Sequence, residues 1–127
     1  MAKTILIYDD DCAELYAKGI QPRSSHLCLP YQSARRLNEE LDRGVIFDLF
    51  LTDLAAEDSQ VGRAGNVLTP DYQTLTGHDL GEKVRKMYPH LPIITWSGYS
   101  YKPDFSTCHL VKPISLNEIL ETINSFL

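Results

Sequence analysis

The amino-acid sequence predicts an α/β domain built on a parallel β-sheet. Four apolar runs each end in polar residues: Thr4-Ile5-Leu6-Ile7-Tyr8, Phe47-Asp48-Leu49-Phe50-Leu51-Thr52, Leu91-Pro92-Ile93-Ile94-Thr95-Trp96 and the shorter His109-Leu110-Val111. Such runs are typical of strands buried on both faces of a sheet. A further strand is expected over Ser25–Leu29. Helix-like segments separate these runs, and this alternation indicates βαβ units.

Two helices are expected before the central strand. The first covers Ala13–Lys18 and is stopped by Gly19 and Pro22, which both disfavour a helix interior. The second covers Ser33–Arg43, where apolar residues recur one turn apart. Gly44 follows it as a C-cap.

Two later helices begin with capping boxes. Thr76 is followed by Asp79 and Ser115 by Glu118, each at the spacing of an N-cap and its reciprocal partner. The apolar stripe of the helix that follows Thr76 is Leu80, Val84 and Met87. The buried face of the last helix is Leu116, Ile119, Leu120, Ile123 and Phe126 or Leu127.

Two connections depart from a regular βαβ pattern. The polar stretch Ala55–Thr76 is long for a loop in a compact domain, and loops of this length are usually functional or disordered. Gly98–Cys108 is short and contains Gly, Pro and aromatic residues without helical spacing. We therefore expect a mobile loop after the central strand and no helix of normal length between the last two strands.

Composition limits the classes of function. The 127 residues form one domain, 1–127, and carry a net charge of -5 without a Lys/Arg cluster, which disfavours direct nucleic-acid binding. No apolar run approaches the roughly 20 residues of a membrane span. Asp9 interrupts the first apolar run too early for a signal peptide. Cys12, Cys28 and Cys108 lack metal-ligand spacing, so we expect reduced thiols in a cytoplasmic protein.

The polar residues that follow the strands are the candidate functional residues. In open α/β sheets, ligands bind outside the carboxyl ends of the strands. These ends supply Asp9, Asp10, Asp53, Ser97 and Lys112. Neighbouring carboxylates repel one another unless a cation lies among them, and Mg²⁺ binds one or two carboxylates together with water. A magnesium site with Asp9 and Asp10 as ligands is therefore expected.

Asp53 is the best candidate for a nucleophile because it stands alone at its strand end. An aspartate can attack phosphorus to give an acyl phosphate, a step that depends on positioning and on neutralising the equatorial oxygens. Mg²⁺, the Lys112 ammonium and the Ser97 hydroxyl could each face some of those oxygens. Each residue also has an ordinary structural interpretation: a solvated turn for Asp53 or Ser97, and a surface side chain for Lys112.

The order of these residues resembles the receiver domain of two-component response regulators. The matching segments span nearly the whole chain: Ile5-Leu6-Ile7-Tyr8-Asp9-Asp10, Asp48-Leu49-Phe50-Leu51-Thr52-Asp53, Pro92-Ile93-Ile94-Thr95-Trp96-Ser97-Gly98 and His109-Leu110-Val111-Lys112-Pro113. The resemblance implies a flavodoxin-like, doubly wound sheet of five parallel strands in the order 2-1-3-4-5.

The resemblance also implies a function and its partners. Mg²⁺ would be held by Asp9 or Asp10, by Asp53 and by the backbone carbonyl of Ala55. A histidine kinase or phosphotransfer protein would phosphorylate Asp53, making the domain an autocatalytic phosphoacceptor rather than a turnover enzyme. Lys112 and Ser97 would contact the phosphoryl group, and an unidentified output protein would respond.

Four features depart from the family pattern. His109 stands where family members often place the aromatic residue of the switch, so an imidazole would have to serve with Ser97. The stretch after Asp53 lacks the usual Met-Pro, and the fourth helix of the family is shortened or missing. The first helix is also weak. These departures indicate retained chemistry with a changed output surface.

Two other functions remain open at this point. The same fold could be a pseudo-receiver, a binding module that works without phosphorylation. A haloacid-dehalogenase-type phosphatase would use Asp9 and Asp11 as its Asp-x-Asp pair. That class needs a further acidic pair after the lysine, and Pro113–Leu127 contains no Asp.

Overall fold

The computed structural model describes residues 2–54 and 75–127. Within them lies a five-stranded parallel sheet in the order β2-β1-β3-β4-β5, which confirms the predicted fold class. Its strands are β1 Thr4–Tyr8, β2 Leu27–Tyr31, β3 Leu49–Asp53, β4 Ile93–Ser97 and β5 Cys108–Val111.

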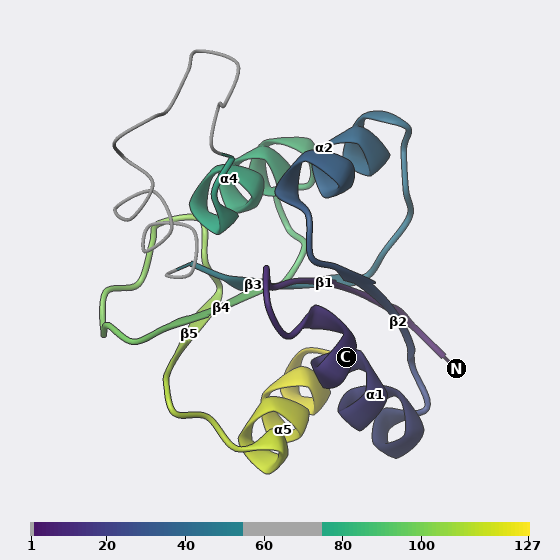
Figure 1. Ribbon diagram of the computed structural model, residues 1–127, viewed down its shortest axis with the longest axis vertical. Coiled ribbons are helices and arrows are strands. Elements are labelled where there is room, and N and C mark those ends of the chain that lie inside the picture. Colours follow the sequence, from purple (N-terminus) through teal and green to yellow (C-terminus); the bar gives the residue numbers. More distant parts are fainter. Residues whose placement is uncertain (1, 55–74) are drawn as a thin grey trace.

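Helices cover both faces of the sheet, as Figure 1 shows. Helices α2 (Ala34–Asp42) and α4 (Gly77–Met87) lie on one face, and α1 (Ala13–Ser24) and α5 (Leu116–Phe126) on the other. The first pair packs on the face that bears Phe50, and the second on the face that bears Ile5. The sheet therefore has two cores, which is why its central strands are apolar along their whole length.

Helix α1 is longer than predicted. It continues through Gly19 and Pro22 to Ser24, so the expected end at Lys18 is wrong. Ile20 is fully buried, and a Cβ at Gly19 would lie 3.2 Å from Leu116 of α5. Burial of this surface against α5 outweighs the local cost of Gly and Pro, because propensity is a weak term beside tertiary packing.

Several strand starts also differ from prediction; β4, for example, begins at Ile93 rather than Leu91. Strand β2 begins at Leu27 rather than Ser25 and includes Pro30, which an edge strand tolerates. Strand β3 begins at Leu49 rather than Phe47. The Asp48 carboxylate accepts a hydrogen bond from the Thr4 backbone N–H at 2.8 Å, so Asp48 ties the start of β1 to the segment before β3.

The capping predictions are confirmed, and the predicted apolar faces need one change, at Met87. Both capping boxes form, at Thr76 and at Ser115. Met87 is 37% exposed and does not belong to the buried stripe of α4. At the end of α5, Leu127 packs against the core whereas Phe126 is exposed. Helix α2 has Ser33 as its N-cap, and Gly44 just beyond it has a φ of 88°.

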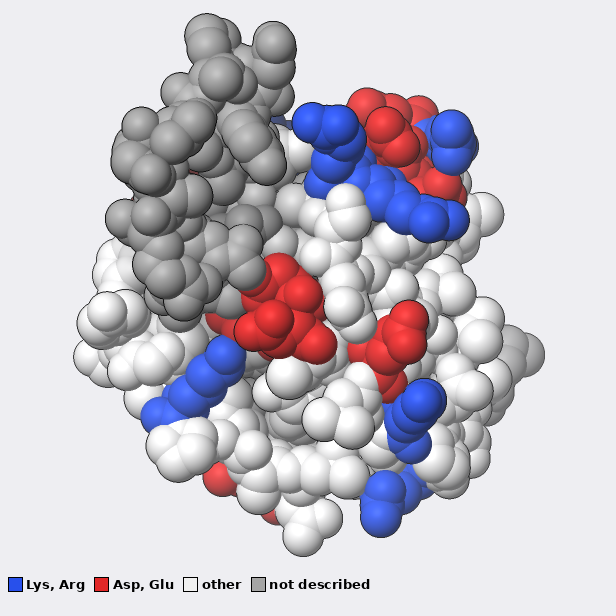
Figure 2. Space-filling model, viewed as in Figure 1, with Lys and Arg blue, Asp and Glu red and all other residues white. Residues whose placement is uncertain are grey.

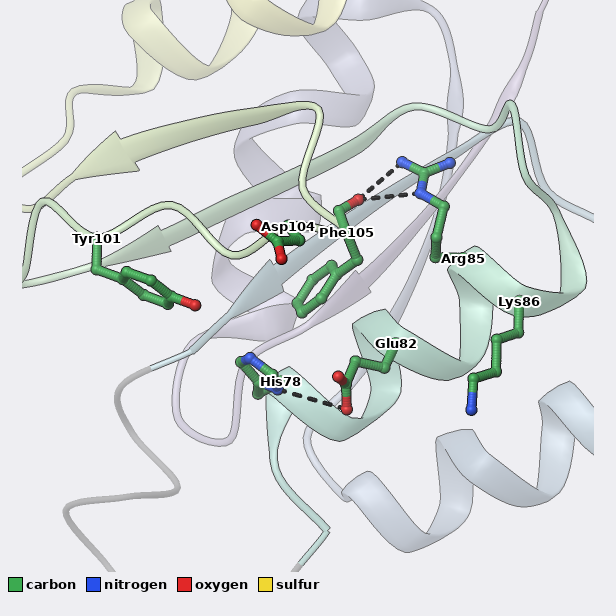
Figure 3. Close-up of a pocket in the computed structure, with 7 residues that line it drawn as sticks. All are labelled: His78, Glu82, Arg85, Lys86, Tyr101, Asp104 and Phe105. Atoms are coloured by element: carbon green, nitrogen blue, oxygen red, sulfur yellow. Dashed lines mark hydrogen bonds and ion pairs between the residues drawn. The ribbon is translucent and has the colours of Figure 1, made fainter.

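The connection between β4 and β5, residues 98–107, contains no helix, as predicted. Its Phe105 is buried against α4 at Gly81, where a Cβ would meet the ring at 2.1 Å. The Arg85 guanidinium of α4 donates to the Phe105 carbonyl at 2.8 and 3.0 Å (Figure 3). The buried Phe105 ring and the hydrogen bonds from Arg85 thus hold this loop against α4.

Two expectations about the rest of the chain can be placed against the structure. The predicted mobile loop Ala55–Thr76 lies outside the described residues except for Leu75 and Thr76. Among the helices of the described segments, none has the length and apolar character needed to cross a bilayer.

Candidate functional site

The predicted site residues come together at one edge of the sheet. Strands β1, β3, β4 and β5 are consecutive neighbours and all parallel, so their carboxyl ends meet there. Figure 2 shows acidic side chains gathered where β1 ends and α1 begins, with a basic side chain beside them. Strand pairing places Asp53 opposite Trp96, next to Ser97.

Asp53 and Lys112 form the central ion pair of this edge. Lys112 Nζ donates to Asp53 Oδ2 at 2.5 Å, and the Asp53 side chain is only 1% exposed, against 36% for Lys112. Burial alone would lower the pKa of Lys112, but the hydrogen bond and charge of Asp53 outweigh it and raise this pKa, with help from Asp9. Lys112 is therefore a fixed cation, and the solvated-turn and surface-lysine interpretations do not fit these two residues.

Asp9 shapes the turn into α1. It is buried, and its Oδ1 accepts hydrogen bonds from the backbone N–H groups of Asp11 and Cys12, both at 2.9 Å. Both donors belong to the turn that immediately precedes α1. One oxygen of Asp9 is therefore committed to the backbone, and Oδ2 is its remaining atom for a cation.

Asp10 lies in a field of like charge. Burial raises the pKa of its carboxyl, and the charges of Asp11, Asp9 and Asp53 raise it further. A divalent cation would relieve this repulsion, and carboxylate oxygens are the ligands that Mg²⁺ prefers. The residues present fit Mg²⁺ through the chemistry of their donor set.

The acidic cluster does not form a closed three-ligand cage. Within residues 2–54 and 75–127, the group of His, Cys, Asp and Glu ligand atoms that lie within 4.8 Å of one another is His78, Asp79 and Glu82, at the surface of α4. The described acids of this edge thus leave coordination positions open, which suits an ion that keeps several waters. The Ala55 carbonyl, the third ligand implied by the resemblance, lies outside the described residues.

Ser97 and His109 are joined in a hydrogen-bond network that the sequence did not reveal. Ser97 is 4% exposed, and its Oγ lies 3.0 Å from the Tyr99 carbonyl and 3.2 Å from His109 Nε2. The other ring nitrogen of His109 lies 2.7 Å from Thr95 Oγ1, which lies 2.9 Å from Ser106 Oγ. Thr95 and Ser106 were missed, although a hydroxyl within an apolar strand such as β4 is a signal of a buried partner.

Trp96 provides an internal reporter of this edge. It is the one tryptophan of the chain, it is fully buried, and it pairs in register with Asp53. Its ring lies 4.9 Å from that of Tyr16 in α1. A change of charge at the Asp53 edge is therefore expected to alter its fluorescence.

Comparison with known proteins identifies the class of fold. No protein-family model and no curated protein sequence matches the chain. Among solved structures, its fold is that of CheY-like response regulator receiver domains. At the identities found, this likeness establishes the fold, and the resemblance inferred from the sequence is confirmed in that respect.

Two structures illustrate the likeness. The response regulator TrrA from Thermotoga maritima, in complex with Mg²⁺-BeF, has a TM-score of 0.72 at 20% identity, over 98% of this chain and 99% of that one. The chemotaxis response regulator CheY4 of Vibrio cholerae has a TM-score of 0.73 at 17% identity, over 100% of both chains. The alignments thus span essentially the whole length of the chains.

Proposed function

We propose that this chain is a cytoplasmic signalling receiver in which Asp53 accepts a phosphoryl group, in a Mg²⁺-dependent reaction, from a histidine kinase or phosphotransfer protein. The modified domain then changes its contacts with an output protein. The observation that carries the proposal is the buried Asp53–Lys112 pair at a strand end beside the Asp9–Asp10 acids.

The chemistry follows from this arrangement. A carboxylate oxygen of Asp53 attacks the phosphorus of the donor, a new O–P bond forms, and the P–N bond of a phosphohistidine breaks with its electron pair leaving on the imidazole. The product is an acyl phosphate. Lys112 already contacts Asp53 and is placed to remain on the phosphoryl oxygens as a point charge. The Ser97 hydroxyl can donate to the same group once it turns from Tyr99.

Asp10 and Asp53 would hold the metal, with Asp9 Oδ2 as a further oxygen nearby. When bound, Mg²⁺ would supply positive charge that neutralises the equatorial phosphoryl oxygens. The TrrA structure with Mg²⁺-BeF supports this assignment by analogy. Asp9 also holds the turn that leads into α1, so its loss would affect both folding and reaction.

The experiment is phosphorylation by a small phosphodonor such as acetyl phosphate in the presence of Mg²⁺. We expect one phosphoryl group on Asp53 by mass spectrometry, none in Asp53→Asn, and none in EDTA. Asp48→Asn is the matched control, because Asp48 precedes the same strand at its opposite end. Trp96 fluorescence, titrated with Mg²⁺, reports occupancy in the same samples.

Two results would overturn the proposal. Equal phosphoryl uptake by Asp53→Asn, or by the wild type in EDTA, would contradict the roles of Asp53 and the metal. A folded wild-type protein that takes up no phosphoryl group, either from acetyl phosphate or from histidine phosphotransfer proteins, would instead favour the phosphorylation-independent binding module.

A further inference from the structure

A chain of buried polar side chains connects Ser97 with the loop that replaces the missing helix. Thr95, Ser97 and Ser106 are each at most 4% exposed, although all three carry hydroxyls. His109 of β5 lies between them, with one ring nitrogen toward Thr95 and the other toward Ser97. Buried hydroxyls need hydrogen-bond partners, so the partners that they share define a network with restricted geometry.

The direction of the hydrogen bonds follows from one carbonyl. Nε2 of His109 lies 2.8 Å from the Tyr99 carbonyl, which can only accept, so Nε2 carries a proton. In the neutral ring Nδ1 is then an acceptor, and it takes the hydroxyl proton of Thr95 at 2.7 Å. The Thr95 oxygen in turn accepts from Ser106 at 2.9 Å. The donors therefore run in one order, from Ser106 through Thr95 and His109 to Tyr99.

Ser97 shares the end of this chain. Its hydroxyl donates to the Tyr99 carbonyl at 3.0 Å and accepts from the Tyr99 N–H at 3.1 Å, while His109 Nε2 lies 3.2 Å away. If Ser97 turns toward a phosphoryl group on Asp53, the Tyr99 N–H loses its acceptor and the Tyr99 carbonyl loses one of its donors. His109 is then the remaining partner of Tyr99, so any rearrangement of Tyr99 reaches the imidazole.

The far end of the chain lies in the loop fixed on α4. Ser106 follows Phe105, whose ring is buried at Gly81 and whose carbonyl is held by Arg85. Figure 3 shows the Phe105 ring over α4 with the Arg85 guanidinium directed at its backbone. The Cys108 carbonyl also lies 2.9 Å from Ser106 Oγ, so the single hydroxyl proton of Ser106 can pass from Thr95 to this second acceptor. A change in the orientation of His109 would therefore alter the hydrogen bond between Thr95 and Ser106, and so reach the loop.

We propose that Thr95 and Ser106 are positioning residues that hold the His109 imidazole in its Nε2–H form against Tyr99, and that this chain carries the movement of Ser97 to residues 105–107. The transmission rests on the proposed function, because phosphorylation of Asp53 would start the movement of Ser97. The hydrogen-bond chain in the unmodified protein does not depend on that function. It concerns residues whose hydroxyls lie away from the reacting carboxylate and act on Ser97 through His109.

The resting geometry is tested first, without any phosphoryl group. The ring ¹⁵N signals of His109, assigned with His109→Gln among the four histidines, should show a fixed Nε2–H tautomer in the neutral ring. Thr95→Val removes the hydroxyl at nearly constant volume and should convert the signals to those of mixed tautomers, whereas Thr95→Ser should restore them. Thr107→Val is the matched control, because its hydroxyl contacts Arg85 and the Ile93 N–H but not this chain.

The transmission is tested with Mg²⁺ and beryllofluoride. In the wild type we expect amide shifts at Tyr99 and at residues 105–107. In Thr95→Val and Ser106→Ala the Tyr99 shift should persist while the shift at residues 105–107 falls by about twofold or more, the size of a coupling between residues in one network. Trp96 fluorescence confirms that each variant is occupied, and Ser106→Ala, which removes a single hydroxyl in a loop, covers the case in which Thr95→Val does not fold.

The outcomes separate the two proposals. Phosphoryl uptake that is absent in the wild type would overturn the proposed function. His109 ring signals in Thr95→Val identical to those of the wild type would overturn the resting chain, whatever the uptake. Normal occupancy in Ser106→Ala with undiminished shifts at residues 105–107 would overturn the transmission.

Discussion

The two partners of the central ion pair have different surroundings, since Asp53 is the last residue of β3 and Lys112 directly follows β5. Every residue of β3 is buried, and it pairs with β1 and β4. Strand β5 pairs with β4 alone, three of its residues are half-buried, and Val111 is exposed. The carboxylate is therefore held by the most enclosed strand, and the lysine and His109 come from one of the least enclosed.

This difference assigns separate tasks to the two strands. A buried position fixes the geometry of a nucleophile, because close-packed neighbours leave few alternative positions. A strand at the edge of the sheet has fewer packing contacts and can move at lower cost. The site thus combines a fixed acceptor with partners that can respond, and substitutions on the two sides should differ in kind.

The largest effect is expected where α4 meets β3. A Cβ at Gly77 would lie 1.9 Å from the Asp53 carbonyl oxygen, whereas the atoms nearest to a Cβ at Gly81 belong to the Phe105 ring. Gly77→Ala should lower the free energy of unfolding by about 3 kcal/mol, because the buried backbone at Asp53 cannot move aside. Gly81→Ala should lower it by about 1 kcal/mol, because the Phe105 side chain can shift and Ala favours the helix. Denaturant unfolding measures both. Gly98→Ala, with open space around it, is the control, and equal costs at positions 77 and 81 would contradict the comparison.

The two partners of the ion pair should respond unequally to removal. Lys112→Met leaves the Asp53 carboxylate buried without this cation and should destabilise the domain by about 3 kcal/mol. Asp53→Asn leaves a lysine that is 36% exposed and can be hydrated, so its cost should stay below about 1 kcal/mol. Urea unfolding at neutral pH without Mg²⁺ gives both values. A larger loss of unfolding free energy in Asp53→Asn than in Lys112→Met would contradict this prediction, because it would mean that the unpaired lysine is harder to hydrate than the unpaired carboxylate.

The smallest effect compares the two edge strands through their thiols. Burial raises the pKa of Cys28 in β2 to about 11, and its N–H is held by Gln21 of α1. Since the thiolate is the reactive form, Cys28 at pH 8 should be only about 0.1% reactive, and its alkylation should accelerate as the pH rises toward 11. Half-buried Cys108 in β5 should be alkylated faster at pH 8, as peptide mass spectrometry would show. Faster alkylation of Cys28 than of Cys108 would contradict this prediction and indicate that β2 is the more accessible edge strand.

Much of the site was predictable because its residues follow strands. The apolar runs located the strands, and parallel strand ends share one edge, so Asp53 and Lys112 could be brought together although 59 positions separate them. Both capping boxes were predictable for a similar reason, since their partners are local in sequence. The missing helix between β4 and β5 followed from breakers within residues 98–107.

The remainder depended on tertiary contacts that leave weak local signals. Gly19 and Pro22 read as stops, and only the packing of Ile20 and Leu116 keeps α1 helical past them. The partnership of Thr95 with Ser106 depends on how the loop returns to β5, which no periodicity specifies. The committed oxygen of Asp9 likewise follows from the turn that it forms, not from its place in the acid run.

Arg85 has a consequence for how this domain can change over generations. Of its six hydrogen bonds to the described residues, five go to main-chain carbonyls, those of Phe105 (twice), Tyr88, Pro89 and Leu91, and the sixth goes to the Thr107 hydroxyl. A carbonyl is present whatever side chain its residue carries. The exposed Tyr99 and Tyr101 can therefore be substituted while the loop stays attached to α4, because none of these hydrogen bonds depends on their side chains.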